Sequence, residues 1–470
     1  MGKAGTSAAQ FEQMTTAPVP RLILRLAVPT IISMLVTSIY NMADTFFVGQ
    51  LGTSATGAVG VVFSIMAMIQ AVGFTLGMGS GSLISRLLGQ QSQQTANEVA
   101  ATAFYSALAL GLVMTAAGLA FLDPLVRALG ATDTIAPYAR GYAQYILLGA
   151  PIMAASFVMN NLLRAQGRAS QAMVGLTLGG LLNIGLDPLF IFAFDMGIAG
   201  AAIATVASQC VSFLILLSFF LRGKSLVTLS FRNLSRRGSV YLSILKTGFP
   251  SLCRQGLASL ASVALNVGAA PYGDAAVAAM GIIGRISMFV ISAVLGFGQG
   301  FQPVVGYNYG ARQYTRVRQA FSFTVKVGTL ALAVLAVAGY LFAPALIAIF
   351  RRDDPQVIAI GAYAFRAQCL ALPLQALVII TNMLLQGTGH AASATFTSSA
   401  RQGLFFLPFV LTLPAFMGLT GVQVAQPLAD VATFACCIPL VIRFFRRLPA
   451  DAALAPGGTP SISSGESPQA

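Results

Sequence analysis

The stretch GFTLGMGSGSLISRLLG, residues 73–89, has a counterpart in VLGFGQGFQPVVGYNYG, residues 294–310, which lies 221 residues further along the chain. Glycines coincide at three positions of these stretches, so that Gly77, Gly79 and Gly89 match Gly298, Gly300 and Gly310. The same offset pairs Pro29 with Pro250, Gly52 with Gly273, Met196 with Met417, and Gly200 with Gly421. With one residue of slip, Asn160 and Gly167 match Asn382 and Gly389. This spacing predicts two homologous halves.

Both copies of the repeat belong to a chain that is too apolar for a soluble fold. Of its 470 residues, 56% are hydrophobic and only 9% are charged, whereas about 25% of residues are charged in a soluble domain. Apolar runs of about 20 residues, long enough to cross a bilayer, recur from Leu22 to Phe445. We predict an all-α integral membrane protein with twelve transmembrane helices, near residues 22–49, 55–82, 98–122, 137–163, 171–194, 198–221, 241–268, 275–306, 317–343, 358–386, 393–415 and 419–442.

The twelve helices divide into two homologous six-helix lobes. The expected parts are a cytoplasmic N-terminal segment at 1–21, an N-lobe at 22–221, a basic cytoplasmic linker at 222–240, a C-lobe at 241–447 and a disordered tail at 448–470. Because six is even, both lobes enter the membrane in the same orientation. We expect an axis along the membrane normal to relate them, with a substrate site near their interface.

The net charge of +14 comes from basic residues between the apolar segments. Such a pattern is the positive-inside signal of a membrane protein rather than a nucleic-acid footprint. With the N-terminus inside, the inner segments hold Lys3, Arg21, Arg25, Arg86, Arg164, Arg168, Arg222, Lys224, Arg232, Arg236, Arg237, Arg312, Arg316, Arg443, Arg446 and Arg447. The outer segments hold Arg127, Arg140, Arg351 and Arg352. We therefore expect a monomer in the cytoplasmic (inner) membrane, surrounded by lipid, with both termini in the cytoplasm and no nucleic-acid partner.

An enzyme is the class of protein that the motifs favour least. The chain has no His-Glu-x-x-His zinc motif, no phosphate-binding Gly-Lys-Ser/Thr loop and no Gly-x-Ser-x-Gly elbow. Its single histidine, His390, has no second histidine with which to form a metal site. We expect no catalytic residues and no resident cofactor.

Two acidic residues fall inside apolar segments, where an ionisable side chain is costly and usually functional. Asp44 follows Tyr40 by four residues, and Asp187 follows Asn183 by four, so each acid has a polar neighbour on the same helix face. Pro188 cannot donate a hydrogen bond, which frees a backbone carbonyl beside Asp187. A poorly solvated carboxylate in such surroundings can take up a proton from outside and release it inside.

The repeat makes these acids asymmetric. At the 221-residue offset, Asp44 corresponds to Leu265 and Asp187 to Pro408, so the second half lacks the pair. An architectural role would be expected in both halves, and the asymmetry therefore favours an ion-coupling site in the first. The alternatives are helix capping or pairing with an arginine. Five further charged residues within the helices have either a functional role or a snorkelling and charge-neutralising one: Arg254, Arg285, Arg366, Arg401 and Asp430.

Several segments resemble the multidrug and toxic compound extrusion (MATE) family. They are Val28-Pro29-Thr30 with Tyr40 and Asp44, Asn160-Asn161-Leu162-Leu163-Arg164-Ala165-Gln166-Gly167, and Asn183-Ile184-Gly185-Leu186-Asp187-Pro188-Leu189-Phe190-Ile191-Phe192. Gly248-Phe249-Pro250-Ser251-Leu252-Cys253-Arg254-Gln255 and Gly296-Phe297-Gly298-Gln299-Gly300-Phe301-Gln302-Pro303 look like its DinF-like and MepA-like branch. The resemblance covers about residues 20–447.

The resemblance implies a V-shaped pair of six-helix bundles. It implies an antiporter that exports hydrophobic, often cationic, small molecules in exchange for H⁺ or Na⁺. Carried over by motif position, the ion-coupling residues are Tyr40, Asp44, Asn160, Asn183, Asp187 and Thr205. We favour H⁺. Na⁺ is the alternative, because Asp44, Asp187, Asn183 and Thr205 offer the oxygen ligands that a hard cation prefers. At the motif position in the seventh helix, Arg254 and Gln255 replace the acid of Na⁺-coupled members of another branch.

The substrate site is less defined by sequence than the coupling site. We expect Arg254, Gln255, Met34, Met153 and Met288 to line a cavity, because methionines make adaptable apolar walls. Amphiphilic cations are the expected substrates. The alternative is a flippase of the same superfamily that moves lipid-linked oligosaccharides or other amphiphiles, and it would need a more strongly basic cavity.

Overall fold

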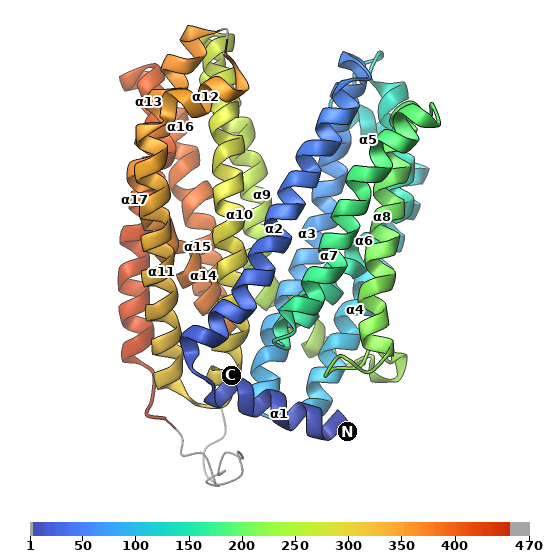
Figure 1. Ribbon diagram of the computed structural model, residues 1–470, viewed down its shortest axis with the longest axis vertical. Helices are drawn as coiled ribbons and strands as arrows, with labels where there is room; N and C mark the ends of the chain where they lie inside the picture. Colours follow the sequence, from blue (N-terminus) through green and yellow to red (C-terminus); the bar gives the residue numbers. More distant parts are fainter. Residues whose placement is uncertain (1–2, 353, 452–470) are drawn as a thin grey trace.

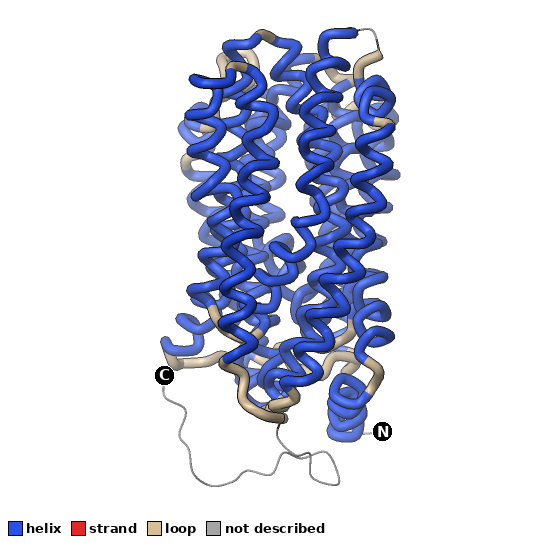
Figure 2. The backbone as a smooth tube through the Cα atoms, turned by 90° about the vertical axis from the view of Figure 1, so that its left-hand side faces the viewer, coloured by secondary structure: helices blue, strands red, loops and turns tan. Residues whose placement is uncertain are grey.

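The computed structural model describes residues 3–352 and 354–451, and over these residues it contains helices and no strands (Figure 2). The long helices run side by side. Large apolar side chains cover their outer faces: Leu370 is 74% exposed and Leu214 is 61% exposed. Because every backbone polar group of a helix is satisfied internally, such an outer surface suits lipid.

Six long helices form the N-lobe. They are α2 (Val19–Gly49), α3 (Thr53–Gly89), α4 (Gln93–Ala120), α6 (Ala136–Ala165), α7 (Ala169–Pro188), which continues as the π-helical turn η1 (Leu189–Ala193), and α8 (Gly197–Leu221). The short α5 (Leu122–Ala128) lies between α4 and α6 and was not predicted.

The C-lobe repeats this order. Its helices are α9 (Gly238–Ala269), α10 (Asp274–Gly310), α11 (Tyr314–Leu341), the short α12 (Ala343–Phe350), α13 (Pro355–Ala371) with η4 (Leu372–Leu374) and α14 (Gln375–Gly387), α15 (Ala391–Ser399) with η5 (Ala400–Phe406) and α16 (Leu407–Met417), and α17 (Leu419–Arg446). A short 3-10 turn, η3 (Ala270–Tyr272), follows α9.

Eleven helices of the described chain are long and apolar enough to cross a membrane. The remaining long helix, α9, has 32 residues but carries Lys246, Arg254 and Gln255 in its middle. It occupies the first position of the C-lobe, as α2 does in the N-lobe, and we count it as the twelfth span. The all-α fold with two six-helix lobes that the sequence predicted is confirmed.

The repeat has a direct structural counterpart in the helix lengths and turns. Helices α3 and α10 each have 37 residues, and α4 and α11 each have 28. The glycines that precede α3 and α10 adopt the same left-handed backbone, with φ of 113° at Gly52 and 91° at Gly273. A side chain would strain that conformation, which explains why both halves place glycine at this turn.

The two lobes contact each other through pairs of residues that the repeat exchanges. A Cβ atom on Gly89 would overlap the carbonyl oxygen of Tyr307, and one on Gly310 would overlap that of Arg86. The 221-residue offset converts the first pair into the second. Such reciprocal contacts are the signature of a two-fold relation between two copies of one unit. The axis therefore passes between α3 and α10.

Figure 1 shows how the lobes are arranged. Their helices diverge toward the upper end and meet at the lower end, where α1 (Lys3–Thr16) and the end of α17 lie. We call this lower end the terminal end. Helix α2 packs against both α7 of its own lobe and α10 of the other lobe. The shape agrees with the V-shaped pair of bundles expected from the resemblance.

Three parts of the chain lie outside the lobes: the N-terminal segment, the linker and the tail. The segment 1–21 contains the helix α1, and α2 begins at Val19 rather than at residue 22. The linker 222–240 contains η2 (Phe231–Asn233), and its first part docks on the N-lobe. There Gln166 Oε1 accepts hydrogen bonds from Ser225 Oγ at 2.9 Å and from the backbone N–H of Leu226 at 2.6 Å. Most of the tail expected to be disordered, residues 452–470, lies outside the described residues.

Candidate functional site

A buried polar cluster lies inside the N-lobe and brings together predicted side chains from three helices. Helix α2 supplies Tyr40 and Asp44, α7 supplies Asn183 and Asp187, and α8 supplies Thr205. Asp187 is completely buried, and Tyr40, Asn183 and Thr205 are each less than 9% exposed. Asp44 is partly buried. The structure therefore encloses in one lobe five of the six residues that the sequence assigned to ion coupling.

The cluster holds more hydrogen-bond acceptors than donors. Asn183 Nδ2 donates to Asp187 Oδ1 at 3.2 Å and to Thr205 Oγ1 at 3.4 Å. Within the described structure, Asp44 Oδ1, Asp187 Oδ2 and Asn183 Oδ1 are buried without any partner. Buried polar atoms almost always have partners, and an unpaired buried carboxylate is destabilising. The cluster is therefore suited to receive a proton or a small cation.

Sequence reasoning missed one member of this cluster, Tyr142 of α6. Its side chain is fully buried, and its hydroxyl interacts electrostatically with Asp44, Asp187, Tyr40 and Thr205. The hydroxyl has Asp44 and Thr205 as hydrogen-bonding neighbours, but it completes a full hydrogen bond with neither. A phenol can donate as well as accept, so Tyr142 can bond to either acid when a proton moves. A tyrosine inside an apolar helix was the only sequence signal for it.

Asn160, the sixth residue of the sequence assignment, has a defined partner elsewhere. Its amide donates to the carbonyl oxygen of Ala172 at 2.9 Å and ties α6 to α7. Asn382 makes the equivalent bond to Ala394 at 2.7 Å in the C-lobe. A bond present in both lobes joins consecutive helices and is not specific to the acid pair.

Metal binding offers no alternative centre. No group of three or more His, Cys, Asp and Glu side chains that could hold a metal ion occurs among the residues that the structure describes. The oxygen atoms of Asp44, Asp187, Asn183 and Thr205 are the set on which Na⁺ coupling would depend.

A second candidate site is a cavity of about 630 Å³ inside the C-lobe. Its wall is made by α9, α10, α13, α14, α15, η5 and α17. Arg254, Gln255 and Met288 lie on this wall, as sequence reasoning expected. Met34 and Met153 do not line it: Met153 is 1% exposed and packs in the N-lobe core, and Met34 is partly buried on α2. Both belong to the other lobe, which explains their separation from this cavity.

The C-lobe also contains a buried acid, Asp430 of α17, but its environment is the opposite of that of the N-lobe acids. Arg401 of η5 forms an ion pair with it, with Nε 2.7 Å from Oδ1. Three glutamine amides also donate to its carboxylate, at 2.8–3.0 Å: Gln368, Gln375 and Gln426. Four donors saturate this carboxylate, so it has no capacity left for a proton or a cation.

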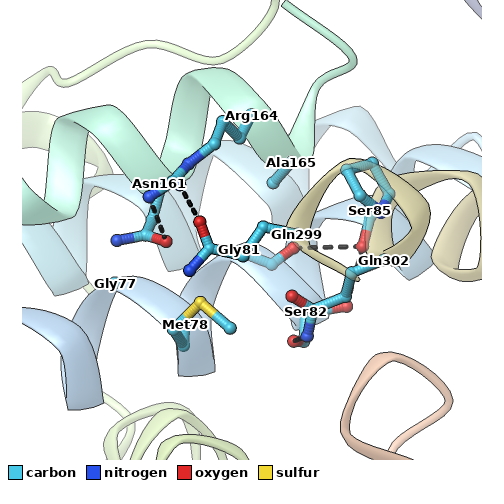
Figure 3. A pocket seen from close by; sticks show the side chains of 11 residues that line it. Gly77, Met78, Gly81, Ser82, Ser85, Asn161, Arg164, Ala165, Gln299 and Gln302 are labelled. Carbon is cyan, nitrogen blue, oxygen red and sulfur yellow. Dashed lines mark hydrogen bonds between the residues drawn. The ribbon is translucent and has the colours of Figure 1, made fainter. Parts of the chain in front are cut away.

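Polar contacts close the space between the lobes near the terminal end (Figure 3). Arg164 of α6 donates to Gln299 of α10, and Arg164 Nη2 also donates to Asn161 Oδ1 at 3.0 Å. Gln302 of α10 donates to Ser82 of α3 at 2.9 Å. The Arg164–Gln299 and Gln302–Ser82 bonds join residues of different lobes, so these two must break if the lobes are to separate here.

Two homologous six-helix bundles that diverge at one end, with buried ionisable residues inside them, define a membrane transporter. The family model described as MatE matches residues 29–189 and 250–412. The chain belongs to the MatE family.

Individual relatives agree with this assignment. The multidrug export proteins MepA of Staphylococcus saprophyticus and Staphylococcus haemolyticus are 26% and 27% identical to the chain, over 92% of it and 95% of each relative. A crystal structure of MATE in complex with MaL6 has a TM-score of 0.89 and 28% identity, covering 93% of this chain and 98% of that one. An outward-facing MATE family transporter has a TM-score of 0.88 at the same identity and coverage. These proteins are transporters, not enzymes.

Proposed function

We propose that the protein is a multidrug efflux antiporter of the cytoplasmic membrane, which exchanges exported amphiphilic small molecules for protons bound at Asp44 and Asp187. The names of its MepA relatives support multidrug export. The observation that carries the proton coupling is the surplus of acceptors: three buried oxygen atoms of Asp44, Asp187 and Asn183 have no donor. Both termini lie in the cytoplasm, as the distribution of basic residues indicates.

Proton binding supplies the donor that the cluster lacks. A proton on Asp187 Oδ2 removes a buried charge and gives that oxygen a hydrogen to donate. The change alters the bonding of Asn183 and Tyr142, and it can therefore favour a different packing of α2, α6 and α7. A ligand moves such an equilibrium only if it binds one arrangement better than the other. Coupling follows when the proton favours one arrangement of the lobes and the exported molecule favours the other.

Proton exchange is favoured over Na⁺ because the described residues of the C-lobe include no buried acid that is free of donors. Its buried carboxylate, Asp430, is saturated by Arg401 and three glutamines. Na⁺ at the N-lobe oxygens remains the competing coupling ion. Amphiphilic cations remain the substrates that the sequence predicts, and the acids to which such cations would be attracted lie in the N-lobe.

The test is drug efflux from proteoliposomes with a pH gradient and a Na⁺ gradient applied separately. We expect the pH gradient to drive efflux of a dye such as ethidium, and the Asp44→Asn and Asp187→Asn variants to lose this response. The matched control is Asp195→Asn. Asp195 is an exposed acid of the N-lobe with a left-handed backbone conformation, and asparagine tolerates that conformation as well. Efflux by both variants at the parental rate under a pH gradient would refute the assignment of Asp44 and Asp187 to proton coupling. Efflux driven only by the Na⁺ gradient would identify Na⁺ as the coupling ion in place of H⁺.

A further inference from the structure

The charges around the C-lobe cavity are all of one sign. Three arginines line it, Arg254 from α9, Arg285 from α10 and Arg401 from η5, and no aspartate or glutamate does. Within the described structure, Arg401 alone of the three has an acidic partner, the buried Asp430 behind the wall. The ion pair leaves no net charge, so two arginines remain to set the potential of the cavity.

Arg254 and Arg285 have no ion-pair partner in the described part of the chain. Arg254 Nη1 is buried and makes no hydrogen bond there. A guanidinium is strongly stabilised by a carboxylate or phosphate that accepts from its parallel N–H groups. Arg254 lines the cavity with a guanidinium whose hydrogen-bonding capacity is not filled, and an anionic ligand in the cavity is therefore favoured.

Snorkelling is the ordinary explanation for an arginine in a membrane helix, but Arg254 does not fit it. It lies 16 residues from the start of the 32-residue α9, or about 24 Å along the helix axis at 1.5 Å per residue. Both ends of the helix are equally distant, and an arginine side chain is far too short to reach either. The charge therefore stays at the middle of the membrane, beside the cavity.

The surface that the rest of the wall exposes is mostly apolar, with Met280, Met288, Leu295 and Phe406 among its side chains, although serine, asparagine and glutamine side chains lie between them. Methionine and aromatic walls accept apolar bodies of varied shape. A hydrophilic anion would leave this surface without a partner, whereas the apolar part of an amphiphile would cover it. The ligand therefore needs both an anionic group and an apolar body.

We propose that the C-lobe cavity is a binding site for amphiphiles that carry a carboxylate or phosphate group, held by Arg254 and Arg285. The inference rests on the proposed export of amphiphiles and names a class of them. The two lobes then differ in the charge that they offer to a ligand. The acids without enough donors lie in the N-lobe, and the arginines without an acidic partner line the C-lobe cavity. Amphiphilic cations are repelled from this cavity, because their positive charge would lie beside the positive charges of the two arginines.

Binding of three pyrene derivatives with one apolar body tests the proposal. They are 4-pyrenebutyrate, the uncharged 4-pyrenebutanol and a 4-pyrenebutyl-trimethylammonium salt. Each is titrated against the full chain in phosphatidylcholine nanodiscs, with empty nanodiscs subtracted and no ion gradient present. We expect pyrenebutyrate to bind at least about tenfold more tightly than the other two, as suits a charge-assisted bond. Added salt should weaken only the butyrate.

Variants assign the effect to the arginines. We expect Arg254→Gln and Arg285→Gln together to remove the preference for butyrate and Arg254→Lys to keep most of it. The matched control, Arg351→Gln, removes an exposed arginine of the same lobe outside the cavity and should change nothing. Equal affinity for the three derivatives in the parental protein, or tighter binding of the ammonium compound, overturns the proposal without needing any variant.

Two further measurements ask whether the natural anion is a lipid and whether anion binding is independent of proton coupling. Adding phosphatidic acid to the nanodiscs should displace pyrenebutyrate if the natural anion is a lipid headgroup, and should not if it is a free amphiphile; either result supports an anion site. Asp44→Asn and Asp187→Asn should leave this binding intact, because both acids lie in the other lobe. Selective binding without proton-driven efflux would then refute the antiport mechanism and leave the cavity assignment standing.

Discussion

At the scale of the residue, the number of donors around a carboxylate distinguishes the buried acids of the two lobes. Asp430 accepts from four donors, including the guanidinium of Arg401, and is fully satisfied. Asp187 accepts only from Asn183, and its second oxygen has no partner in the described structure. The first arrangement fixes the charged state, and the second can change its protonation. Two buried acids of one chain thus differ in how far their charge is satisfied by donors.

This contrast has a measurable consequence for stability. Asp430→Asn leaves the partly buried Arg401 without its counter-ion, and breaking a buried ion pair from one side costs about 3–5 kcal/mol. We expect a large fall in the thermal unfolding midpoint of the purified protein. Asp187→Asn replaces a poorly satisfied charge by a neutral amide, so its midpoint should stay close to the parental value. The double variant that carries both Arg401→Gln and Asp430→Asn should recover part of the fall in the unfolding midpoint. Equal midpoints for the two single variants would contradict the argument.

The sequence reveals the acid pair because an acid in an apolar helix is conspicuous. It does not reveal Tyr142, because a tyrosine in a helix is as often at a lipid interface or in a core as in a polar cluster. Nor does it reveal the pairing of Arg401 with Asp430, since their contact depends on how the π-helical turn η5 faces α17. Contacts between side chains of separate helices need the packing angle, which no local pattern specifies.

At the scale of the element, glycines determine how closely helices from different lobes approach. A Cβ atom on Gly79 of α3 would overlap the carbonyl of Ile244 and the backbone of Gly248 on α9. A Cβ atom on Gly300 of α10 would likewise overlap the backbone of Ala27 on α2. The matched glycines of the repeat are therefore needed for close packing between the lobes rather than for flexibility within a helix.

Replacing Gly79 by alanine should force α3 and α9 apart, because backbone atoms cannot move aside as a side chain can. Overpacking of this kind costs about 1–3 kcal/mol, and we expect a corresponding fall in thermal stability. The matched control is Gly256→Ala on α9, where nothing lies within 4 Å of an added Cβ. Alanine is the better helix former, so this variant should be unchanged or slightly stabilised. A Gly79→Ala protein as stable as the Gly256→Ala protein would argue against close packing here.

At the scale of the whole molecule, much of the architecture is predictable because the repeat and the hydropathy pattern carry it independently. The 221-residue offset gives the two lobes, and the apolar runs give the long helices. Short helices such as α1, α5 and α12 escape prediction, because each is too short or too polar to show a membrane pattern. Helix α1 is the most consequential omission, since its position involves both lobes.

Helix α1 lies across the terminal end (Figure 1) and contacts both lobes. Ser7 Oγ donates to Gln93 of the N-lobe at 3.2 Å. On the other side, Asn308 donates to the carbonyl of Met14 at 3.0 Å, and Arg316 donates to that of Ala17 at 2.6 Å. The Met14 side chain is fully buried. A segment bonded to both lobes resists their separation at this end.

Weakening the contact of this segment with the C-lobe should therefore favour opening at the terminal end. In a protein whose five cysteines are replaced, Ser82→Cys places one thiol in the closed region of Figure 3, where Ser82 is 2% exposed. Arg316→Gln should increase its labelling by a membrane-impermeant maleimide several-fold when the terminal end faces the reagent. The control is Arg318→Gln, which removes a bond to Phe445 within the C-lobe alone. Equal labelling rates in the two variants would show that this segment does not hold the lobes together, because of these two arginines Arg316 alone bonds to it.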